Sequence, residues 1–303
     1  MARGRFAPSP TGDLHLGNLR TALLAWLFAR SAGSEFLIRM EDLDLERVRA
    51  EHYTSQLEDL RDLGLDWDGR VTKQGDRLGI YSAVLDRLQA DGHVYECFCT
   101  RREIRDAPSA PHEDLPEGAY PGTCRNLSGA ERRERVAGGR PPALRIRADA
   151  ARVEFEDQLH GLVEGVVDDF VLRRNDGAAA YQLAVVVDDS EAGIEQVVRG
   201  DDLLDSTPRQ IFLAGLLGLS SPAYAHVPLV LGPDRTRLAK RHGAVTLGDR
   251  AENGHPPAQT LGLLAGSLGL AATGEQVTPA LLVERFDPAG LPREPWVLDA
   301  SAL

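Results

Sequence analysis

The first 40 residues constrain the fold more than any other part of the chain. Residues 4–7 predict a short strand, and a turn rich in proline and glycine covers residues 8–12. Residues 17–30 are apolar on most of the circumference of a helix, and residues 35–40 predict a second strand. A strand, a helix and a strand in this order form a βαβ unit with parallel strands and a right-handed crossover. The sequence therefore predicts an α/β fold built on a parallel sheet.

Later segments continue this alternation. Amphipathic helices are expected over residues 46–63 and 78–90. The apolar, β-branched run from Tyr181 to Val187 predicts a buried strand, and strand, helix and strand segments are expected after it, at residues 194–198, 208–217 and 227–231. After Asp249 the chain predicts two or three short helices.

A region between these two halves has a different composition. From His93 the chain is rich in cysteine, proline, glycine and arginine, with short strand-like pieces at residues 143–147 and 170–174. We expect an inserted lobe that splits the sheet domain. The expected divisions are a first half of the sheet domain at 1–92, the lobe at 93–180, the second half of the sheet domain at 181–234, and a loop with a small helical region at 235–303.

Charge and composition exclude some classes of protein. The formal net charge is -12, which argues against holding nucleic acid by bulk electrostatics alone. No uninterrupted apolar run is long enough to span a membrane, and the N-terminus has no secretory pattern, so the expected compartment is the cytoplasm. Some stretches of the chain are locally rich in arginine, at residues 101–105, 132–147, 173–174 and 235–241. They could form a basic surface track that contacts nucleic acid, or they could be ordinary solvated faces.

All three cysteines fall within one short segment of the lobe. Cys97-x-Cys99 and Cys124 supply three thiolates, and tetrahedral zinc takes four ligands. Tyr120, His112 or His93 could complete such a site. The alternative is a set of buried free thiols.

The loop between the first strand and its helix contains His15-Leu16-Gly17-Asn18. A helix N-terminus offers free N–H groups and the positive end of the helix dipole, so an ATP phosphate could bind there with His15 as a further donor. The alternative is a plain loop with a surface histidine, since the pattern lacks the glycines and lysine of a Walker loop.

Charged residues follow two other expected strands. Glu41 lies at the carboxyl end of the second strand, where α/β folds bind ligands, and could hold a substrate ammonium. Asp42 and Asp44 are explained equally well as helix caps. In the segment 235–242, Lys240 stands among three arginines and suits a moving phosphate charge, although a solvated basic loop has the same composition.

Together these segments resemble the glutamyl-tRNA synthetase family of class I aminoacyl-tRNA synthetases over roughly residues 3–245. Residues 5–12 with His15-Leu16-Gly17-Asn18 look like the first class I signature, and residues 237–241 look like the second. The resemblance implies a Rossmann-like parallel sheet split by a zinc-containing lobe, with ATP and Mg²⁺ used to activate L-glutamate. The glutamate pocket it implies comprises Arg5, Ala7, Ser9, Glu41, Tyr181 and Arg199.

The resemblance also implies roles for the signature and cysteine residues. His15 and Lys240 would be catalytic, and Gly17 and Asn18 would join them in binding ATP. The zinc ligands would be Cys97, Cys99, Tyr120 and Cys124.

Two departures from the family pattern refine the expected substrate. Arg237 and Ala239 replace the usual lysine and serine of the second signature, so a hydroxyl contact to phosphate is missing. The chain also ends about 60 residues after Lys240, where full synthetases continue into anticodon-binding domains of typical domain size. We therefore expect a monomer, without an anticodon-binding domain, that transfers glutamate to the queuosine base of tRNA(Asp). The alternatives are a truncated enzyme that charges the 3′ end of tRNA(Glu) and a silent tRNA- or nucleotide-binding protein.

Overall fold

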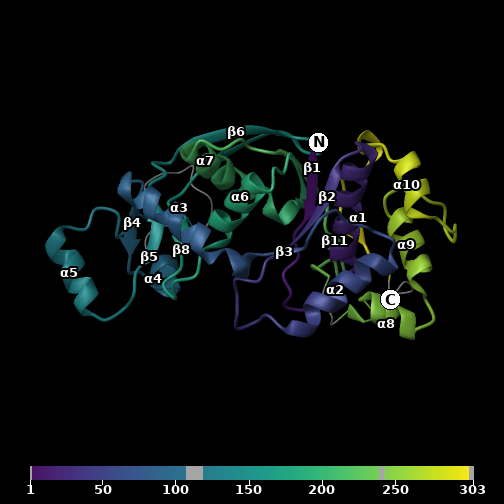
Figure 1. Ribbon diagram of the computed structural model, residues 1–303, viewed down its shortest axis with the longest axis horizontal. Helices are drawn as coiled ribbons and strands as arrows, with labels where there is room; N and C mark the ends of the chain where they lie inside the picture. Colours follow the sequence, from purple (N-terminus) through teal and green to yellow (C-terminus); the bar gives the residue numbers. More distant parts are fainter. Residues whose placement is uncertain (1, 107–118, 239–241, 244, 300–303) are drawn as a thin grey trace.

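A computed structural model describes residues 2–106, 119–238, 242–243 and 245–299 (Figure 1). His112, Ala239 and Lys240 lie outside these ranges. Within the described residues no helix is long and apolar enough to cross a membrane.

A seven-stranded sheet organises the molecule. Its strands all run parallel to their neighbours except for the last pair, β6 and β7, which is antiparallel. This confirms the predicted α/β fold with a mostly parallel sheet. In spatial order the strands are β3 (Thr72–Lys73), β2 (Glu35–Met40), β1 (Arg3–Phe6), β9 (Gln196–Gly200), β10 (Ala223–Val227), β6 (Arg152–Asp157) and β7 (Gly161–Val166).

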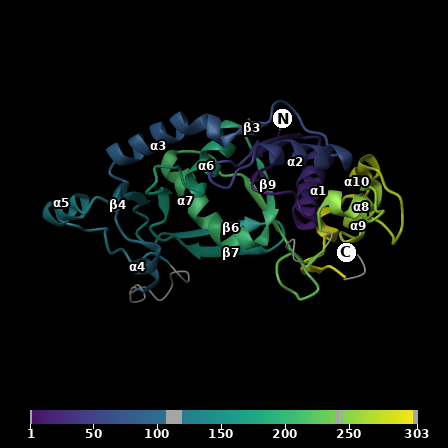
Figure 2. The ribbon, with the colours of Figure 1, turned by 90° about the horizontal axis from the view of Figure 1, so that it is seen from below.

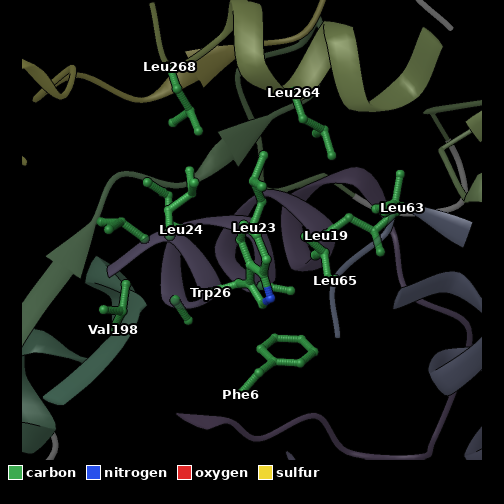
Figure 3. Close-up of a cluster of buried hydrophobic side chains, with 14 of the residues drawn as sticks. Phe6, Leu19, Leu23, Leu24, Trp26, Leu63, Leu65, Val198, Leu264 and Leu268 are labelled. Carbon is green, nitrogen blue, oxygen red and sulfur yellow. The ribbon is translucent and has the colours of Figure 1, made fainter. Parts of the chain in front are cut away.

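Helix α1 (Leu16–Ser31) makes the crossover between β1 and β2, as the sequence predicts. The helix is buried on several faces because it lies between the sheet and the C-terminal helices. Figure 3 shows Leu19, Leu23 and Trp26 of α1 in one cluster with Phe6 of β1 and Leu264 of a C-terminal helix. This core holds the N-terminus of α1 at the edge of the sheet.

The other helices of the sheet domain are α2 (Ala50–Asp62), α3 (Leu78–Ala90), α6 (Tyr181–Glu191) and α7 (Thr207–Leu217), with short 3-10 helices η1 (Gln74–Arg77) and η2 (Asp201–Ser206). Helix α3 has the predicted bounds. Helix α2 begins later than predicted, because residues 44–48 form a turn in which the Asp44 carbonyl accepts from Arg47 and Val48.

The predicted strand over Tyr181–Val187 is wrong, because these residues form the first two turns of α6. Residues 183–189 are all buried, so side chains on every face of this helix find apolar or ion-pair partners. A short apolar run with β-branched residues has the same pattern in a buried helix and a buried strand. Tertiary packing decides between them here.

The strand predicted over residues 227–231 is divided in two. Strand β10 ends at Val227, and β11 (Val230–Leu231) joins a separate two-stranded sheet with β12 (Trp296–Val297). Pro228 stands at the break, and proline has no N–H to donate to a sheet.

The inserted region contains a three-stranded antiparallel sheet of β4 (Val94–Cys97), β5 (Ala143–Ile146) and β8 (Val171–Arg173), with α4 (Arg101–Asp106) and α5 (Gly129–Ala137). The hairpin of β6 and β7 also falls within residues 93–180, but it extends the main sheet beside β10. Residues 93–180 therefore contribute strands both to the separate three-stranded sheet and to the main sheet.

The C-terminal region contains α8 (Leu247–Glu252), α9 (Pro257–Gly266), α10 (Pro279–Arg285) and the 3-10 helix η4 (Pro288–Gly290). Figures 1 and 2 show these helices at one end of an elongated molecule and the inserted sheet at the other. The edge where β1, β2 and β9 end lies between these two parts.

Candidate active site

The carboxyl ends of β1, β2 and β9 border one cleft of about 780 Å³, beside the N-terminus of α1. This is the edge at which α/β proteins bind ligands, and the volume suits a small-molecule site. The structure brings together every predicted glutamate- or ATP-contacting residue that it describes. Those lining the cleft are Arg5, Ala7, Ser9, His15, Gly17, Asn18, Glu41, Tyr181 and Arg199.

The loop between β1 and α1 is held in place from two sides. Gln56 of α2 donates its amide N–H groups to the carbonyls of Ser9 at 3.0 Å and Gly12 at 2.6 Å. The backbone N–H of Glu41 donates to the Pro8 carbonyl at 2.9 Å. These bonds hold the loop and the end of β2 against each other.

His15 is the N-cap of α1, and the helix itself fixes its ring. His15 Nδ1 accepts from the Asn18 backbone N–H at 3.2 Å, and Asn18 Oδ1 accepts from the His15 backbone N–H at 3.2 Å. Burial lowers the pKa of His15, and the nearby Arg237 charge lowers it further, which favours the neutral ring. Because Nδ1 accepts, the proton of the neutral ring lies on Nε2. The ring can therefore donate one hydrogen bond to an anion at the helix N-terminus.

Gly17 is required by the position of this ring. A Cβ at residue 17 would lie 2.9 Å from His15 Cε1 and 3.0 Å from His15 Nδ1. Such short contacts would displace the imidazole or the start of the helix. The glycine thus permits close packing of the ring on the first helical turn.

Arg199 presents a buried positive charge to the cleft. Its guanidinium donates through Nε to His226 Nε2 at 3.0 Å, through NH1 to Gln210 Oε1 at 2.8 Å, and through NH2 to Thr207 Oγ1 at 2.7 Å. Tyr181 Oη lies 3.4 Å from NH1. Arg199 is 5% exposed, and the described part of the chain supplies no carboxylate ion pair to it. Its orientation is therefore fixed while its charge remains available to an anionic ligand.

A network of buried charges joins β1, β2 and α6 at another part of the cleft. Arg5 donates to Asp189 through Nε at 3.3 Å, and Arg39 pairs with both Asp189 and Glu41, the latter at 3.1 Å. Burial would raise the pKa of Asp189, but Arg39 and Arg5 lower it, so this carboxylate is charged. Arg5 and Arg39 thus have protein counterions, in contrast to Arg199.

Glu41 reaches the cleft with its side chain 13% exposed. Burial raises its pKa, and the Arg39 charge opposes that effect. A cation binding in the cleft would therefore favour ionised Glu41 by the same mechanism as Arg39 does.

Several residues of this site were missed by the sequence analysis. Asp189, Thr207, Gln210 and His226 approach the cleft residues only in the folded chain. Two signals were present: consecutive aspartates at the end of an apolar run, at 188–189, and a histidine at 226 within an apolar strand. Neither pattern specifies a partner by itself.

The segment before the second signature borders the same cleft. Arg237 lines the cleft and pairs with Asp202 at 3.0 Å, while the Leu238 backbone N–H donates to the Val230 carbonyl at 3.2 Å. Lys240 and Ala239 lie outside the described residues, so the predicted role of Lys240 has no structural counterpart here.

The three cysteines form one cluster in the inserted region. Their Sγ atoms lie within 4.8 Å of one another, and Cys99 Sγ and Cys124 Sγ are 3.5 Å apart. Tyr120 Oη is 3.6 Å from Cys99 Sγ. Sulfur atoms on the corners of a tetrahedron around zinc are about 3.8 Å apart for Zn–S bonds of about 2.3 Å, so the cluster fits such an ion. Among the described candidates for a fourth ligand, Tyr120 adjoins the thiols, whereas His93 is not part of the cluster.

Comparison with known protein families places nearly the whole chain in one of them. The model for the catalytic domain of class I tRNA synthetases of the E and Q type matches residues 1–300. The chain is 61% identical over 300 residues to a protein of Nocardia farcinica named glutamyl-Q tRNA(Asp) synthetase, covering 99% of this chain and 94% of that one. A protein of the same name from Symbiobacterium thermophilum is 48% identical over 315 residues, covering 100% of this chain and 98% of that one.

Other relatives carry a different name. Glutamate–tRNA ligase 1 of Halorhodospira halophila is 42% identical over 312 residues, covering 99% of this chain and 65% of that protein. Among solved structures, a glutamate tRNA ligase from Elizabethkingia meningosepticum, in complex with its amino acid, superposes with a TM-score of 0.84 at 26% identity, covering 99% of this chain and 68% of that one.

Proposed function

This chain belongs to the catalytic-domain family of the class I tRNA synthetases of the E and Q type, and from that premise we propose that it activates L-glutamate with ATP and transfers it to the queuosine base of tRNA(Asp). Membership of the family makes it a ligase. The observation that carries the choice of amino acid is the buried Arg199 charge, which has uncharged protein partners and faces the cleft.

Glutamate is the ligand that suits the charges of the cleft. Arg199 would bind its side-chain carboxylate, with Tyr181 beside it, and Glu41 would face its ammonium. Arg5, Ala7 and Ser9 would complete the wall of the pocket. The extra negative charge of this zwitterion matches the buried Arg199 charge, to which the described residues supply no carboxylate.

The nucleotide would lie at the N-terminus of α1. The His15 Nε2–H and the N–H groups of the first turn, with Gly17 permitting close approach, would contact phosphate oxygens. Lys240 would add a positive charge from the second signature, and Mg²⁺ bound to ATP would offset phosphate charge.

In the activation step a glutamate α-carboxylate oxygen attacks the α-phosphorus of ATP, and the bond to the β-phosphate oxygen breaks as pyrophosphate leaves. No side chain forms a covalent intermediate. The protein acts by placing the two reactants in line and by stabilising the charge that moves onto the leaving group. In the second step a hydroxyl of the acceptor attacks the adenylate carbonyl carbon, loses its proton and releases AMP.

The cysteine cluster would hold a structural zinc ion through Cys97, Cys99, Tyr120 and Cys124. The guanidinium of Arg145 lies 3.8 Å from the centre of the Tyr120 ring. Burial and the Cys97 side chain raise the pKa of Tyr120, and the Arg145 charge would act in the opposite direction, toward the phenolate that a tyrosine ligand requires. Such an ion would fix the fold of the inserted region, away from the cleft.

The names of the relatives bear on the acceptor of glutamate. Six relatives named glutamyl-Q tRNA(Asp) synthetase, at 41–61% identity, support queuosine as the acceptor. Relatives named glutamate–tRNA ligase, at 42% identity, support the second candidate, the 3′ end of tRNA(Glu). Because its substrate would be tRNA, we expect the enzyme to act in the cytoplasm.

One experiment separates these candidates. Glutamate-dependent ATP–pyrophosphate exchange tests activation, and its absence would indicate a silent binding protein. Labelled glutamate is then offered with queuosine-containing tRNA(Asp), queuosine-free tRNA(Asp) and tRNA(Glu), and the labelled nucleotide is mapped by nuclease digestion. Label only on the first tRNA, at the modified base, supports the proposal, and label on the 3′ end of tRNA(Glu) refutes it.

A further inference from the structure

Arg199 is connected through His226 to a second buried group, Asp157. His226 Nε2 accepts from Arg199 Nε at 3.0 Å, and on the other side of the ring His226 Nδ1 lies 2.6 Å from Asp157 Oδ2. The side chains of His226 and Asp157 are both 0% exposed. The three groups therefore form a line from the cleft wall into the protein.

Asp157 is itself held by the backbone. It ends strand β6, and its carboxylate accepts from the N–H groups of Leu159 at 2.9 Å, His160 at 3.0 Å and His226 at 3.1 Å. Hydrogen bonds of this kind favour the charged carboxylate. Although burial would raise the pKa of Asp157, the bonds to His226 and the backbone lower it. A charged carboxylate can only accept, so His226 Nδ1 carries the proton that it shares with Asp157.

This proton determines what the other ring nitrogen can do. Burial lowers the pKa of His226, and the neighbouring Arg199 charge lowers it further, which keeps the ring neutral despite Asp157. A neutral ring with its proton on Nδ1 has a lone pair on Nε2, which can accept from the Arg199 Nε–H and from the Thr207 hydroxyl, each at 3.0 Å. The opposite tautomer would place an N–H against an N–H and break this contact.

The hydrogen-bond acceptors around Arg199 orient its guanidinium without neutralising its charge. Nε is used by His226, and Gln210 and Thr207 each take one N–H from the two terminal nitrogens. An acid in place of the histidine would compete with the ligand for the arginine charge. Asp157 instead acts one imidazole away, where it fixes geometry while the adjacent partner of Arg199 remains uncharged.

We propose that Asp157 and His226 are positioning residues for amino-acid recognition: Asp157 sets the His226 tautomer, and His226 orients Arg199 toward the substrate carboxylate. This inference rests on the proposed function, because it assumes that Arg199 reads a carboxylate of glutamate. The relation resembles that of a carboxylate that orients a metal-bound histidine, where loss of the outer partner lowers affinity or activity about 10- to 100-fold.

The test compares two substitutions of similar size at position 226. His226→Gln can place an amide oxygen near the original Nε2 and accept from Arg199, whereas His226→Leu cannot. In pyrophosphate exchange we expect His226→Leu to raise the KM for glutamate about 10- to 100-fold, with the KM for ATP unchanged and a smaller effect on kcat. His226→Gln should recover most of the loss. Equal melting temperatures of the two variants would exclude a difference in folding as the cause.

Nitrogen NMR of ¹⁵N-histidine-labelled protein tests the tautomer without relying on activity. The expected result at neutral pH is an unprotonated Nε2 and a protonated Nδ1 for His226, assigned by its disappearance in His226→Gln, and a change of tautomer in Asp157→Asn. A protonated Nε2 in the wild type overturns the inference. The inference is also overturned if the wild type catalyses pyrophosphate exchange and His226→Leu has the same KM for glutamate. If the wild type catalyses no exchange, the proposed function and this inference are overturned together.

Discussion

Replacing Arg199 with glutamine should change the amino-acid preference of the enzyme as well as its rate. The substitution removes a buried cleft arginine whose hydrogen-bond partners among the described residues are uncharged, and it leaves the substrate carboxylate in a desolvated site without a counterion. It also deprives three buried acceptors of a donor.

Breaking a buried, hydrogen-bonded charge pair costs about 2–5 kcal/mol. At about 1.4 kcal/mol for each factor of ten, this corresponds to a loss of about 30-fold to several thousand-fold in kcat/KM for glutamate. Glutamine carries no side-chain charge, so kcat/KM for glutamine should change much less. The glutamate-to-glutamine ratio should therefore fall by most of that factor.

Pyrophosphate exchange with each amino acid measures this ratio, and the ratio does not depend on the fraction of folded protein. Arg209→Gln is a matched control, because Arg209 lies beside Gln210 on α7 but pairs with Asp168 at 2.7 Å instead of facing the cleft. An unchanged ratio in Arg199→Gln, or an equal fall in the Arg209 control, would refute the assignment of Arg199 as the reader of the side-chain carboxylate.

Four other predictions follow from the site and the lobe. Cys97→Ser should lose about one zinc per chain and lower the melting temperature while ATP binding persists, as measured by elemental analysis and calorimetry; a zinc-free wild type with unchanged melting would contradict it. Gly17→Ala should raise the KM for ATP about 10-fold or more, because its methyl group displaces the His15 ring. An unaltered KM would show that ATP binding does not depend on the present position of this ring. Lys240→Ala should lower the activation rate about 100-fold with little change in glutamate binding, since its charge acts on the transition state, and a near-normal rate would indicate a solvated loop. The pKa of His226 is lowered in the folded state, so this residue contributes stability above its unfolded pKa of about 6.5, and that contribution is lost as the pH falls toward the folded pKa. Urea denaturation at pH 5 and 7.5 should therefore show that His226→Gln loses less free energy of unfolding between these pH values than the wild type does. An identical loss in the two proteins would exclude this contribution.

The N-terminal βαβ unit was predictable because its signals are local. The strand at Glu35–Met40 has the predicted bounds, and α1 differs from its prediction by one residue at each end. The proline- and glycine-rich turn and the helical period act within a few residues of chain. Residues that follow these elements, such as His15 and Glu41, were therefore placed at the correct edge of the sheet.

The error at Tyr181 has a tertiary cause. In α6 the buried aspartates at 188 and 189 both pair with Arg39 of β2, and no local rule predicts that a helix will bury two acids. The hairpin of β6 and β7 was missed for the opposite reason. In β6 charged, exposed residues alternate with the half-buried Val153 and Phe155, but β7 does not keep this alternation, and its Leu162 is exposed.

The positions of Asp157, His226 and Thr207 around Arg199 could not be predicted. These residues come from β6, β10 and the start of α7, and only the sheet order brings them within hydrogen-bond distance. A single sequence contains each residue but not the pairing. The family resemblance identified Arg199, whereas the structure shows what holds it.

The order of strands in the main sheet has a consequence for biosynthesis. β1 pairs with β9, with Gly4 opposite Gln196, so the two walls of the cleft come from opposite sides of the inserted lobe. During translation the first wall leaves the ribosome long before its neighbour exists, and β1 has an unpaired edge until then. Closing such a distant contact is slow. Binding of glutamate by nascent chains of increasing length should therefore appear only after β9 and β10 have emerged, which makes ligand binding a marker for completion of the sheet.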